Sequence, residues 1–437
     1  MQLRPYQTRT IADARQFIAD GAKSVCIVAP TGAGKTVMGA TIGLSAANRN
    51  RRVLWLAHRA ELLQQAHDAL ARIGVESGII APWAAPTSHP VQVASVQTLL
   101  ARGSLPRADV VIPDECHHHV SPQWVQLIRQ YQSAGATIVG LTATPERSDG
   151  VGLCEIYQRI VVSAQVSELI ALGHLVPCRA YGPSSRTKSL AEHPLVAYRR
   201  YADGRPAVAF CASVHAARDL AAEFRGAGIR AAYVDGDLDW PTREQHVADF
   251  RAGKLDILTN MHVLTEGFDA PRVSCIILAR GFSSPGAYIQ ATGRGMRPCE
   301  SKRDLVIVDL LGCAREHGLP SEDRQYSLEG AGIRSAENPE TISQCLACGM
   351  WFRSPEFQDS TCPSCGAKRK GKQDPAVRRA IMTAIATAEP DTARTEYLKR
   401  QVQLCRVKGW KLGRAMMLYK VRYSHWPSDA MKRAAGF

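Results

Sequence analysis

The chain has 437 residues, of which 45% are hydrophobic, so it is too long for one ordinary domain and sufficient for two to four domains with buried cores. No apolar run reaches the roughly 18 residues that a membrane-spanning helix needs, and we therefore expect no membrane partner. Residues 1–7 lack the charged and then apolar pattern of a secretion signal, and most of the thirteen cysteines stand singly in apolar runs. Both features favour a cytoplasmic protein in a reducing compartment.

The formal net charge of +14 is concentrated near the carboxyl end. Residues 366–437 hold 17 Lys and Arg against 5 Asp and Glu, a net +12 that leaves only +2 for the rest of the chain. Such an uneven distribution favours a polyanionic partner, most simply a nucleic acid. A basic surface that is merely solvated would fit an even distribution better.

Residues 29–36 form a glycine-containing loop between an apolar strand, expected at 24–28, and a helix, expected at 37–44. In such a loop backbone N–H groups close on phosphate oxygens, the lysine reaches the terminal phosphates and the hydroxyl binds Mg²⁺. The predicted ligands are Pro30, Thr31, Gly32, Ala33, Gly34, Lys35 and Thr36.

A second apolar run, 108–113, ends in the acidic pair Asp114 and Glu115. A buried strand there would place Asp114 on Mg²⁺ and Glu115 beside the attacking water. The phosphate loop and the acidic pair together predict an enzyme that hydrolyses a nucleoside triphosphate. Lys35, Asp114 and Glu115 are its predicted catalytic residues, and Thr36 and Asp114 its predicted magnesium ligands.

The same alternation of apolar strand and amphipathic helix continues around these motifs. Strands are expected at 53–57, 91–96 and 136–142, with a helix at 60–72. A polar cluster follows each strand, and ligands bind at that edge of open parallel α/β sheets. The first half of the chain therefore predicts a doubly wound parallel sheet.

The motifs and their order resemble those of superfamily 2 helicases, of the DEAD/DEAH-box and type III restriction-helicase group, over about residues 3–310. The matching segments are 4–7, 29–36, 58–59, 95–98, 114–117, 141–145, 209–213, 265–269 and 290–297. The resemblance implies ATP as the nucleotide and a second RecA-like domain without a phosphate loop. Strands of that domain are expected at 207–211, 231–234, 256–259, 274–278 and 304–309. We place the first domain at 1–176 and the second at 177–312.

The resemblance also assigns roles to residues of this chain. Further ATP-binding residues would be Arg4, Gln7, Gly267, Asp269 and Gln290. Residues of the second domain that stabilise the transferred phosphate across the cleft would be Arg294 and Arg297. Nucleic-acid contacts would come from His58, Arg59, Ser95, Gln97, Thr98, Ser213 and Thr265. The residues that couple the two sites would be His117, Thr142 and Thr144.

Two Cys-x-x-Cys pairs separated by 13 residues predict a zinc ribbon at 343–368. Each pair can form a tight knuckle whose thiolates point at one tetrahedral Zn²⁺ ion, and four thiolates leave no open position for catalysis. The predicted ligands are Cys345, Cys348, Cys362 and Cys365. The weakly patterned residues before the ribbon, 313–342, are expected to be a linker.

Residues 369–437 are expected to be a basic helical region that binds nucleic acid, with helices at about 375–388 and 391–407. Its last part interleaves basic side chains with the aromatic residues Trp410, Tyr419, Tyr423 and Trp426. These aromatics can stack on bases or form the core of a small helical cap, and the sequence favours neither.

The predicted fold is therefore α/β: two tandem RecA-like parallel-sheet domains followed by a small zinc ribbon and a helical carboxy-terminal region. A helicase core followed by a four-cysteine zinc element and a basic helical end resembles the RadD-like helicases of bacteria and phages, which implies DNA repair, recombination or phage replication. We expect a DNA helicase or translocase that uses ATP, Mg²⁺ and Zn²⁺ on single-stranded or branched DNA, with RNA left open and no protein partner identified. The alternatives are an ATP-switched clamp that remodels DNA without separating strands, and the motor subunit of a restriction system.

Overall fold

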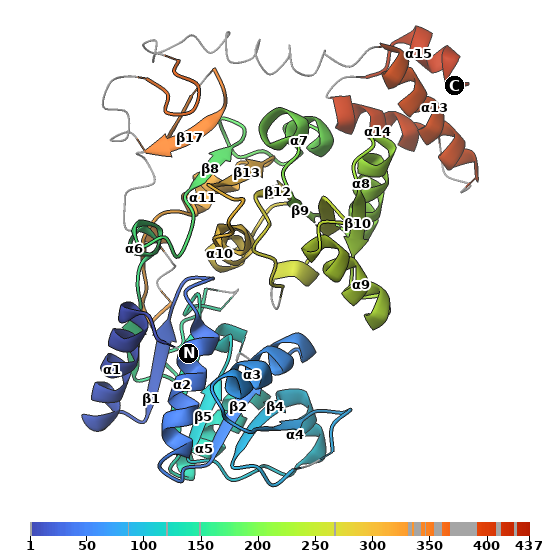
Figure 1. Ribbon diagram of the computed structural model, residues 1–437. Coiled ribbons are helices and arrows are strands. Elements are labelled where there is room, and N and C mark those ends of the chain that lie inside the picture. The colour runs from blue at the N-terminus through green and yellow to red at the C-terminus, as the bar shows by residue number, and fades with distance from the viewer. Residues whose placement is uncertain are drawn as a thin grey trace.

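The structure is a computed structural model that describes residues 2–85, 87–118, 121–147, 150–265, 268–330, 334–335, 342–345, 347–353, 361–367, 391–407, 412–423 and 426–437. Two α/β lobes lie one above the other, with a cysteine-containing segment and a group of helices at the end of the chain beside the second lobe (Figure 1). Within the described part of the chain, every helix is too short or too polar to cross a membrane.

The first lobe holds a seven-stranded sheet in the order β3-β4-β2-β5-β6-β1-β7, and its strand pairs are all parallel. Its strands are β1 (Ser24–Val28), β2 (Val53–Ala57), β3 (Gly78–Ile80), β4 (Val91–Ser95), β5 (Val110–Pro113), β6 (Thr137–Thr142) and β7 (Arg159–Val162). Its helices are α1 (Pro5–Ala19), α2 (Lys35–Ala47), α3 (Ala60–Arg72), α4 (Val96–Arg102), η1 (Cys116–His118), α5 (Pro122–Ser133) and α6 (Val166–Ala171).

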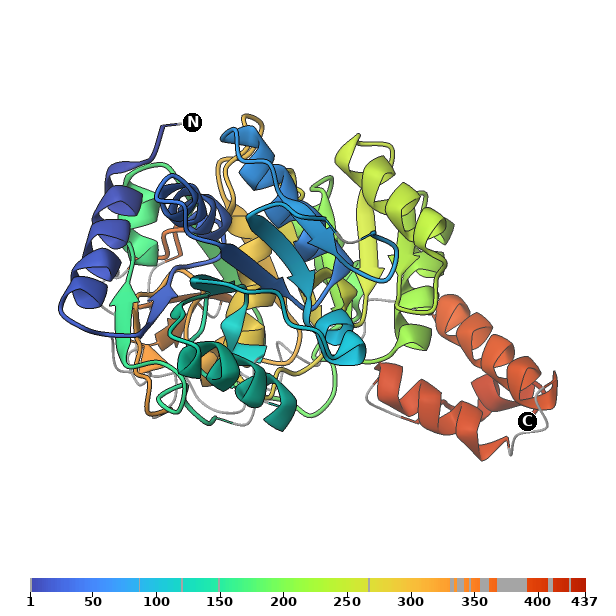
Figure 2. The same cartoon turned by 90° about the horizontal axis from the view of Figure 1, so that it is seen from below.

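Strands β1, β2 and β4 of this lobe are buried on both faces along their whole length, which explains their continuous apolar runs. In β1, Val25 and Ile27 belong to the core that also contains residues of α1, α2 and α3. Cys26 and Val28 point the other way, into the core that contains residues of α4 and α5. The sheet consequently lies between two layers of helices (Figure 2).

The second lobe has an eight-stranded sheet in the order β10-β11-β9-β12-β13-β8-β17-β16. Its strands are β8 (Cys178–Tyr181), β9 (Ala207–Cys211), β10 (Ala231–Val234), β11 (Ile257–Asn260), β12 (Cys275–Ala279), β13 (Leu305–Asp309), β16 (Ile342–Gln344) and β17 (Met350–Arg353). Its helices are α7 (Pro194–Ala202), α8 (Val214–Gly226), α9 (Trp240–Arg251), η2 (Val263–Thr265), α10 (Pro285–Gly293), η3 (Arg294–Met296) and α11 (Cys313–His317). The two-sheet RecA-like fold predicted from the sequence is thus confirmed.

The cysteine-containing segment is part of this second sheet, whereas the sequence predicted a separate ribbon after a purely parallel sheet. Strand β17 pairs antiparallel with β8, and β16 pairs antiparallel with β17. The Trp351 side chain is 1% exposed and lies in the main core, and its backbone pairs with Ala180. The edge of β8 is therefore covered, which removes an unpaired row of backbone groups.

Residues 313–330 were predicted to be the first part of a linker. They form α11, which packs on the second lobe, and the short strand β14 (Arg324–Gln325), which contacts the first lobe. Strand β14 pairs with β15 (Arg334–Ser335). The Gln165 side chain accepts from the Arg324 N–H at 3.2 Å and donates to the Arg324 carbonyl at 2.9 Å. The Cys154 N–H donates to the Leu328 carbonyl at 2.9 Å. The segment is thus a second connection between the lobes.

The helices at the carboxyl end, α13 (Asp391–Val407), α14 (Gly413–Tyr423) and α15 (Asp429–Ala434), share a small core of their own. Tyr419 is fully buried there, and its hydroxyl lies 3.3 Å from the Met431 sulfur. Trp426 is 47% exposed, with the Lys420 ammonium 4.5 Å from its ring centre. Tyr419 is therefore a core residue and Trp426 is not; the predicted helix 375–388, Trp410 and the Tyr423 side chain lie outside the described residues.

Candidate ATP and nucleic-acid sites

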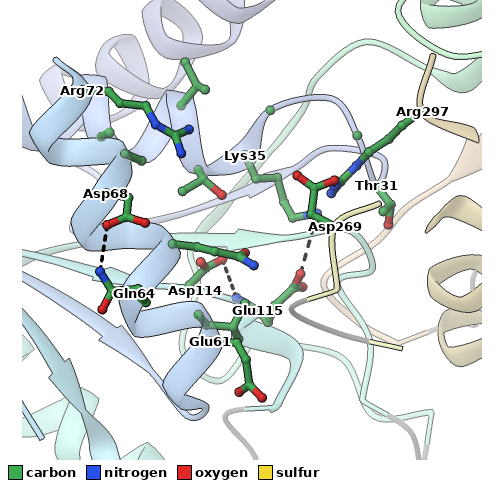
Figure 3. Close-up of a pocket in the computed structure, with 18 of the residues that line it drawn as sticks. Thr31, Lys35, Glu61, Gln64, Asp68, Arg72, Asp114, Glu115, Asp269 and Arg297 are labelled. Atoms are coloured by element: carbon green, nitrogen blue, oxygen red, sulfur yellow. Dashed lines mark hydrogen bonds and ion pairs between the residues drawn. The ribbon is translucent and has the colours of Figure 1, made fainter. Parts of the chain in front are cut away.

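A cleft of about 1290 Å³ between the lobes gathers most of the predicted nucleotide ligands (Figure 3). The predicted residues that line it are Arg4, Thr31, Gly32, Gly34, Lys35, Thr36, Asp114, Glu115, Asp269, Arg294 and Arg297. Pro30 and Ala33 belong to the same loop without lining the cleft, and Gly267 lies outside the described residues.

The phosphate loop is held from behind by the start of α1. The Tyr6 hydroxyl and the Gln7 side-chain amide both donate to the Ala33 carbonyl, at 2.9 and 3.0 Å. Gly34 has a φ of 84°, and a Cβ atom there would lie 2.4 Å from the Gln7 amide nitrogen. Helix α2 then begins at Lys35, so its N-terminus faces the cleft, where it favours phosphate charge. Gln7, which was predicted to bind the nucleotide, thus also supports the phosphate loop.

The acidic pair follows β5 and is buried, with Asp114 4% and Glu115 7% exposed. Burial, and then the Glu115 charge, raises the pKa of Asp114 to about 7. Glu115 has a φ of 45°, a conformation uncommon outside glycine and typical of strained active-site turns. This turn brings the Glu115 carboxylate within 3.8 Å of the Lys35 ammonium.

This set of groups fits a magnesium ion. Two buried carboxylates stand together with one ammonium near them, so a divalent cation would offset charge that burial disfavours. The Thr36 hydroxyl and the Asp114 carboxylate are hard oxygen donors of the kind that Mg²⁺ prefers. When bound, the ion would neutralise charge on the phosphates.

A hydrogen-bond chain runs from the acidic pair to the second lobe. The His117 Nδ1 atom lies 2.9 Å from the Thr142 hydroxyl, and the His117 Nε2 atom lies 2.9 Å from the Gln290 amide nitrogen of α10. The Thr142 hydroxyl donates to the Thr144 carbonyl at 2.8 Å. When the Gln290 nitrogen donates to Nε2 and the Thr142 hydroxyl donates to Thr144, the network is satisfied by a His117 ring protonated on Nδ1.

The His117 chain also reaches the Glu115 carboxylate, which was predicted to be catalytic. The Nδ1 atom of His117 lies 3.5 Å from the Glu115 Oε2 atom. The Gln290 amide nitrogen is also 3.4 Å from the Thr144 hydroxyl. The three predicted coupling residues and Gln290 therefore form one contiguous network that joins the lobes.

The two predicted arginines face the phosphate loop from the second lobe. A Cβ atom on Gly293 would lie 2.9 Å from the Thr31 Cβ atom, so only glycine lets α10 approach the loop this closely. Arg294 is buried, and its guanidinium donates to the Phe268 carbonyl at 3.2 Å. Arg297 forms an ion pair with Asp269 inside the cleft (Figure 3).

The predicted nucleic-acid residues of the first lobe lie at the ends of adjacent strands β2 and β4. The Ser95 hydroxyl caps α4 by accepting from the Thr98 N–H at 3.4 Å, and it donates to the Gln97 carboxamide oxygen at 3.1 Å. The Gln97 amide in turn donates to the His58 carbonyl at 3.4 Å. Thr98 is buried, and its backbone N–H takes part in the cap that begins α4.

The remaining nucleic-acid candidates belong to the second lobe and the start of α3. Ser213 caps α8, accepting from the Ala216 N–H at 3.0 Å, and its side chain is exposed. Arg59 is the half-buried residue before α3. Thr265 ends η2, and its side chain lies outside the described residues.

Two cleft features were not predicted from the sequence. The Arg243 guanidinium of α9 lies 2.9 Å from the Glu61 carboxylate of α3 and forms a further link between the lobes. It also lies 4.7 Å from the centre of the Trp240 ring, which is 47% exposed and lines the cleft. No motif marks Arg243, because its carboxylate partner Glu61 is distant in the sequence.

The four predicted zinc ligands converge. Their sulfur atoms all lie within 4.8 Å of one another, and the Cys345–Cys365 and Cys348–Cys362 sulfur pairs are each 3.7 Å apart. A tetrahedral site with Zn–S bonds near 2.3 Å has S···S separations of about 3.8 Å. In both knuckles the glycine after the second cysteine donates to the carbonyl of the first at 2.8 Å. The site fits one structural Zn²⁺ ion.

Two RecA-like sheets around one phosphate loop define the class of two-lobed P-loop nucleoside triphosphatases. Residues 1–147 match the family described as type III restriction enzyme, res subunit, and residues 188–299 match the helicase conserved C-terminal domain. The chain belongs to the superfamily 2 helicases, in the type III restriction-like group. It is an ATP-hydrolysing enzyme and an ATP-dependent motor of this group.

Several relatives are similar over most of the chain. A 51.5 kDa protein of a Lactococcus phage is 28% identical over 78% of this chain and 77% of its own length. The putative mitochondrial ATP-dependent helicase irc3 of Schizosaccharomyces pombe is 28% identical over 73% of this chain. The putative ATP-dependent helicase IRC3 of Saccharomyces cerevisiae is 26% identical over 71% of this chain. The chain spans 59% and 52% of the lengths of these two yeast proteins.

Solved structures share the fold. A fragment of a putative HsdR subunit of a type I restriction enzyme from Vibrio vulnificus superposes with a TM-score of 0.60 at 23% identity, over 75% of this chain and 67% of that one. The type ISP restriction-modification enzyme LlaBIII bound to DNA superposes with a TM-score of 0.54 at 17% identity. The match covers 70% of this chain and 27% of that one. The Dbp5 protein of Saccharomyces cerevisiae bound to RNA and ADP BeF3 superposes with a TM-score of 0.52 at 19% identity. The match covers 73% of this chain and 89% of that one.

Proposed function

We propose that this motor moves along or remodels DNA, with single-stranded or branched DNA as its substrate. The observation that carries the proposal is the network from Gln290 to His117, because it ties the catalytic carboxylate of one lobe to the other lobe. A nucleic-acid strand lying across both lobes would step whenever ATP binding or hydrolysis alters this contact. The net +12 charge of residues 366–437 supports a polyanionic partner.

In the proposed cycle Lys35 and the start of α2 bind the phosphates, and Glu115 accepts a proton from the attacking water. Arg294 and Arg297 stabilise the charge that develops on the transferred phosphoryl group. Arg4, Asp269 and Gln290 complete the nucleotide site. His58, Arg59 and Gln97 of the first lobe and Ser213 and Thr265 of the second contact the nucleic acid.

The four cysteines hold a structural zinc ion in this proposal. Solved structures with the same fold are bound to DNA in one case and to RNA in another, so they support a nucleic acid as the partner. The resemblance to RadD-like proteins supports DNA and a role in repair, recombination or phage replication.

The test is the ATPase rate with single-stranded DNA, duplex DNA, forked DNA and RNA, combined with strand displacement on the fork. A DNA helicase is stimulated most by single-stranded or forked DNA and separates the fork. Stimulation without separation would indicate a translocase or clamp, or a restriction motor if only duplex DNA stimulates. Stimulation by RNA alone would contradict the proposal.

A further inference from the structure

Lys302 is a buried lysine that the mechanism above does not use. It is 7% exposed and follows Arg294 and Arg297 in the chain. Its backbone N–H donates to the Cys299 carbonyl at 2.9 Å. A buried ammonium is unfavourable unless its hydrogen-bonding capacity is satisfied. An apolar side chain could fill the same space without needing hydrogen bonds. The groups that the Lys302 ammonium contacts therefore indicate which part of the structure it stabilises.

The ammonium joins the two loops that carry the nucleotide-facing residues of the second lobe. It donates to the Pro271 carbonyl at 2.8 Å and to the Val273 carbonyl at 2.9 Å, both on the loop that leaves Asp269. It donates to the Gly295 carbonyl at 2.9 Å, between the two arginines. An ammonium has three protons, and each is used.

The charge state supports these contacts. Burial lowers the pKa of Lys302 to about 8, so the side chain remains predominantly charged at pH 7. Hydrogen bonds from a charged donor are stronger than those between neutral groups. On the cleft side, the same two loops are joined by the Arg297–Asp269 ion pair and by the bond from Arg294 to the Phe268 carbonyl.

We infer that Lys302 is a positioning residue for ATP hydrolysis: by holding the 271–273 loop against the 294–296 turn, it fixes where Arg294 and Arg297 enter the cleft. The inference rests on the proposed role of the arginines. A small displacement of such groups can lower a rate by about 100-fold without a loss of binding, because the transition state depends on their position.

The experiment is a double-mutant cycle on the full chain, using Lys302→Met and Arg297→Ala with nucleic-acid-stimulated ATPase as the readout. We expect Lys302→Met to lower kcat by about 10- to 100-fold. ATP binding, measured with a fluorescent analogue, should change less than about threefold, because the phosphate loop lies in the other lobe. The matched control is Lys254→Met, since Lys254 is an exposed lysine of the same lobe paired with Asp249 at 3.1 Å, and it should keep its kcat.

The cycle separates positioning from general stability. If Lys302 acts through the arginines, adding Lys302→Met to Arg297→Ala lowers kcat further by less than about threefold. The inference is overturned if the added substitution lowers kcat as much as it does in the otherwise wild-type chain. It is also overturned if Lys302→Met alone has a wild-type kcat. If Lys302→Met does not fold, the same cycle and the same criteria apply to Lys302→Gln, whose amide is polar but too short to reach three carbonyls. If Arg294→Ala and Arg297→Ala both keep full kcat, the proposed function of the arginines fails instead.

Discussion

The carboxylate of Glu115 and the ammonium of Lys35 lie 3.8 Å apart, yet we expect their substitutions to affect turnover by different routes. Lys35→Ala removes a charge from the phosphate site, so we expect it to abolish ATP binding and turnover. Glu115→Gln keeps the phosphate loop and the predicted magnesium ligands, so it should bind ATP but hydrolyse it at least about 100-fold more slowly, as expected for loss of a general base.

These variants are checked by fluorescent-nucleotide binding and steady-state ATPase assays. Lys23→Ala is the control for lysine removal, because Lys23 is exposed and lies outside the cleft. Equal loss of ATP binding in the Lys35 and Glu115 variants would contradict the role given to Glu115.

His117 and Gln290 are expected to act as one unit, because each is the other's partner across the lobes at 2.9 Å. Gln290→Ala and His117→Ala should each lower the ratio of nucleic-acid-stimulated to basal ATPase rate, because each removes the contact between the lobes. In the double variant the losses should not add, with an interaction energy of about 0.5–3 kcal/mol. The ratio of stimulated to basal rate in the four proteins measures this, and additive losses would show that the contact does not carry the coupling.

At the residue scale, the sequence could predict groups that a short local pattern brings together. The loop at 29–36 and the pair at 114–115 line one cleft because each follows a strand of the same parallel sheet. Arg243 and Lys302 could not be found this way. Lys302 donates to backbone carbonyls, which any sequence provides, and the carboxylate partner of Arg243 lies in the other lobe.

At the element scale, the apolar pattern of the sequence was sufficient to predict strands that are buried on both faces and helices with one apolar face. The helices at 60–72 and 391–407 have the predicted bounds. The segment 313–330 was wrongly predicted as a linker because side-chain and backbone hydrogen bonds hold it more than a regular apolar pattern does. Asp323, for example, accepts from the Ser167 N–H at 2.9 Å and from the Ser167 hydroxyl at 2.6 Å.

The zinc knuckles are expected to stabilise the second lobe, because β17 lies between them in sequence and pairs with β8. The Tyr181 hydroxyl also lies 2.9 Å from the Ser364 hydroxyl, between the second knuckle and the sheet. We expect one zinc ion per chain, and Cys348→Ser should release it and lower the melting temperature by several degrees.

Elemental analysis and thermal unfolding test the zinc prediction together. Cys154→Ser is the matched control, since Cys154 is an exposed free cysteine of the first lobe, and it should keep both zinc and melting temperature. A fully folded preparation without zinc or another thiophilic metal would contradict the site. Zinc loss without destabilisation would contradict its link to the second sheet.

At the scale of the whole molecule, the charge and the ATP site occupy different parts of the chain. Every nucleotide-facing residue precedes position 300, whereas residues 366–437 carry a net +12. The helices α13, α14 and α15 have a core of their own, so their removal exposes little of the two lobes. Affinity for DNA and hydrolysis of ATP should therefore be separable by truncation.

The position of the cut decides what the truncation reports. A cut after Glu340 would remove β16 and β17, expose the edge of β8 and take Trp351 out of the core, so weak DNA binding by that protein could reflect a damaged lobe. A cut after Ala367 keeps both strands and all four cysteines while removing all 17 Lys and Arg of the basic region. The two truncations therefore distinguish loss of charge from loss of structure.

We expect the chain cut after Ala367 to keep its zinc and its basal ATPase rate but to bind DNA more weakly. Each Lys or Arg on a phosphate releases counterions, so the logarithm of affinity for single strands falls with the logarithm of salt concentration by about 0.7 per contact. Removing the basic region should flatten that slope, because fewer phosphates are then neutralised. Fluorescence anisotropy of labelled single-stranded DNA at several salt concentrations measures both quantities. If affinity and slope are unchanged, the lobes supply the phosphate contacts and the α13–α15 group is a structural cap whose buried Tyr419 serves only its own core.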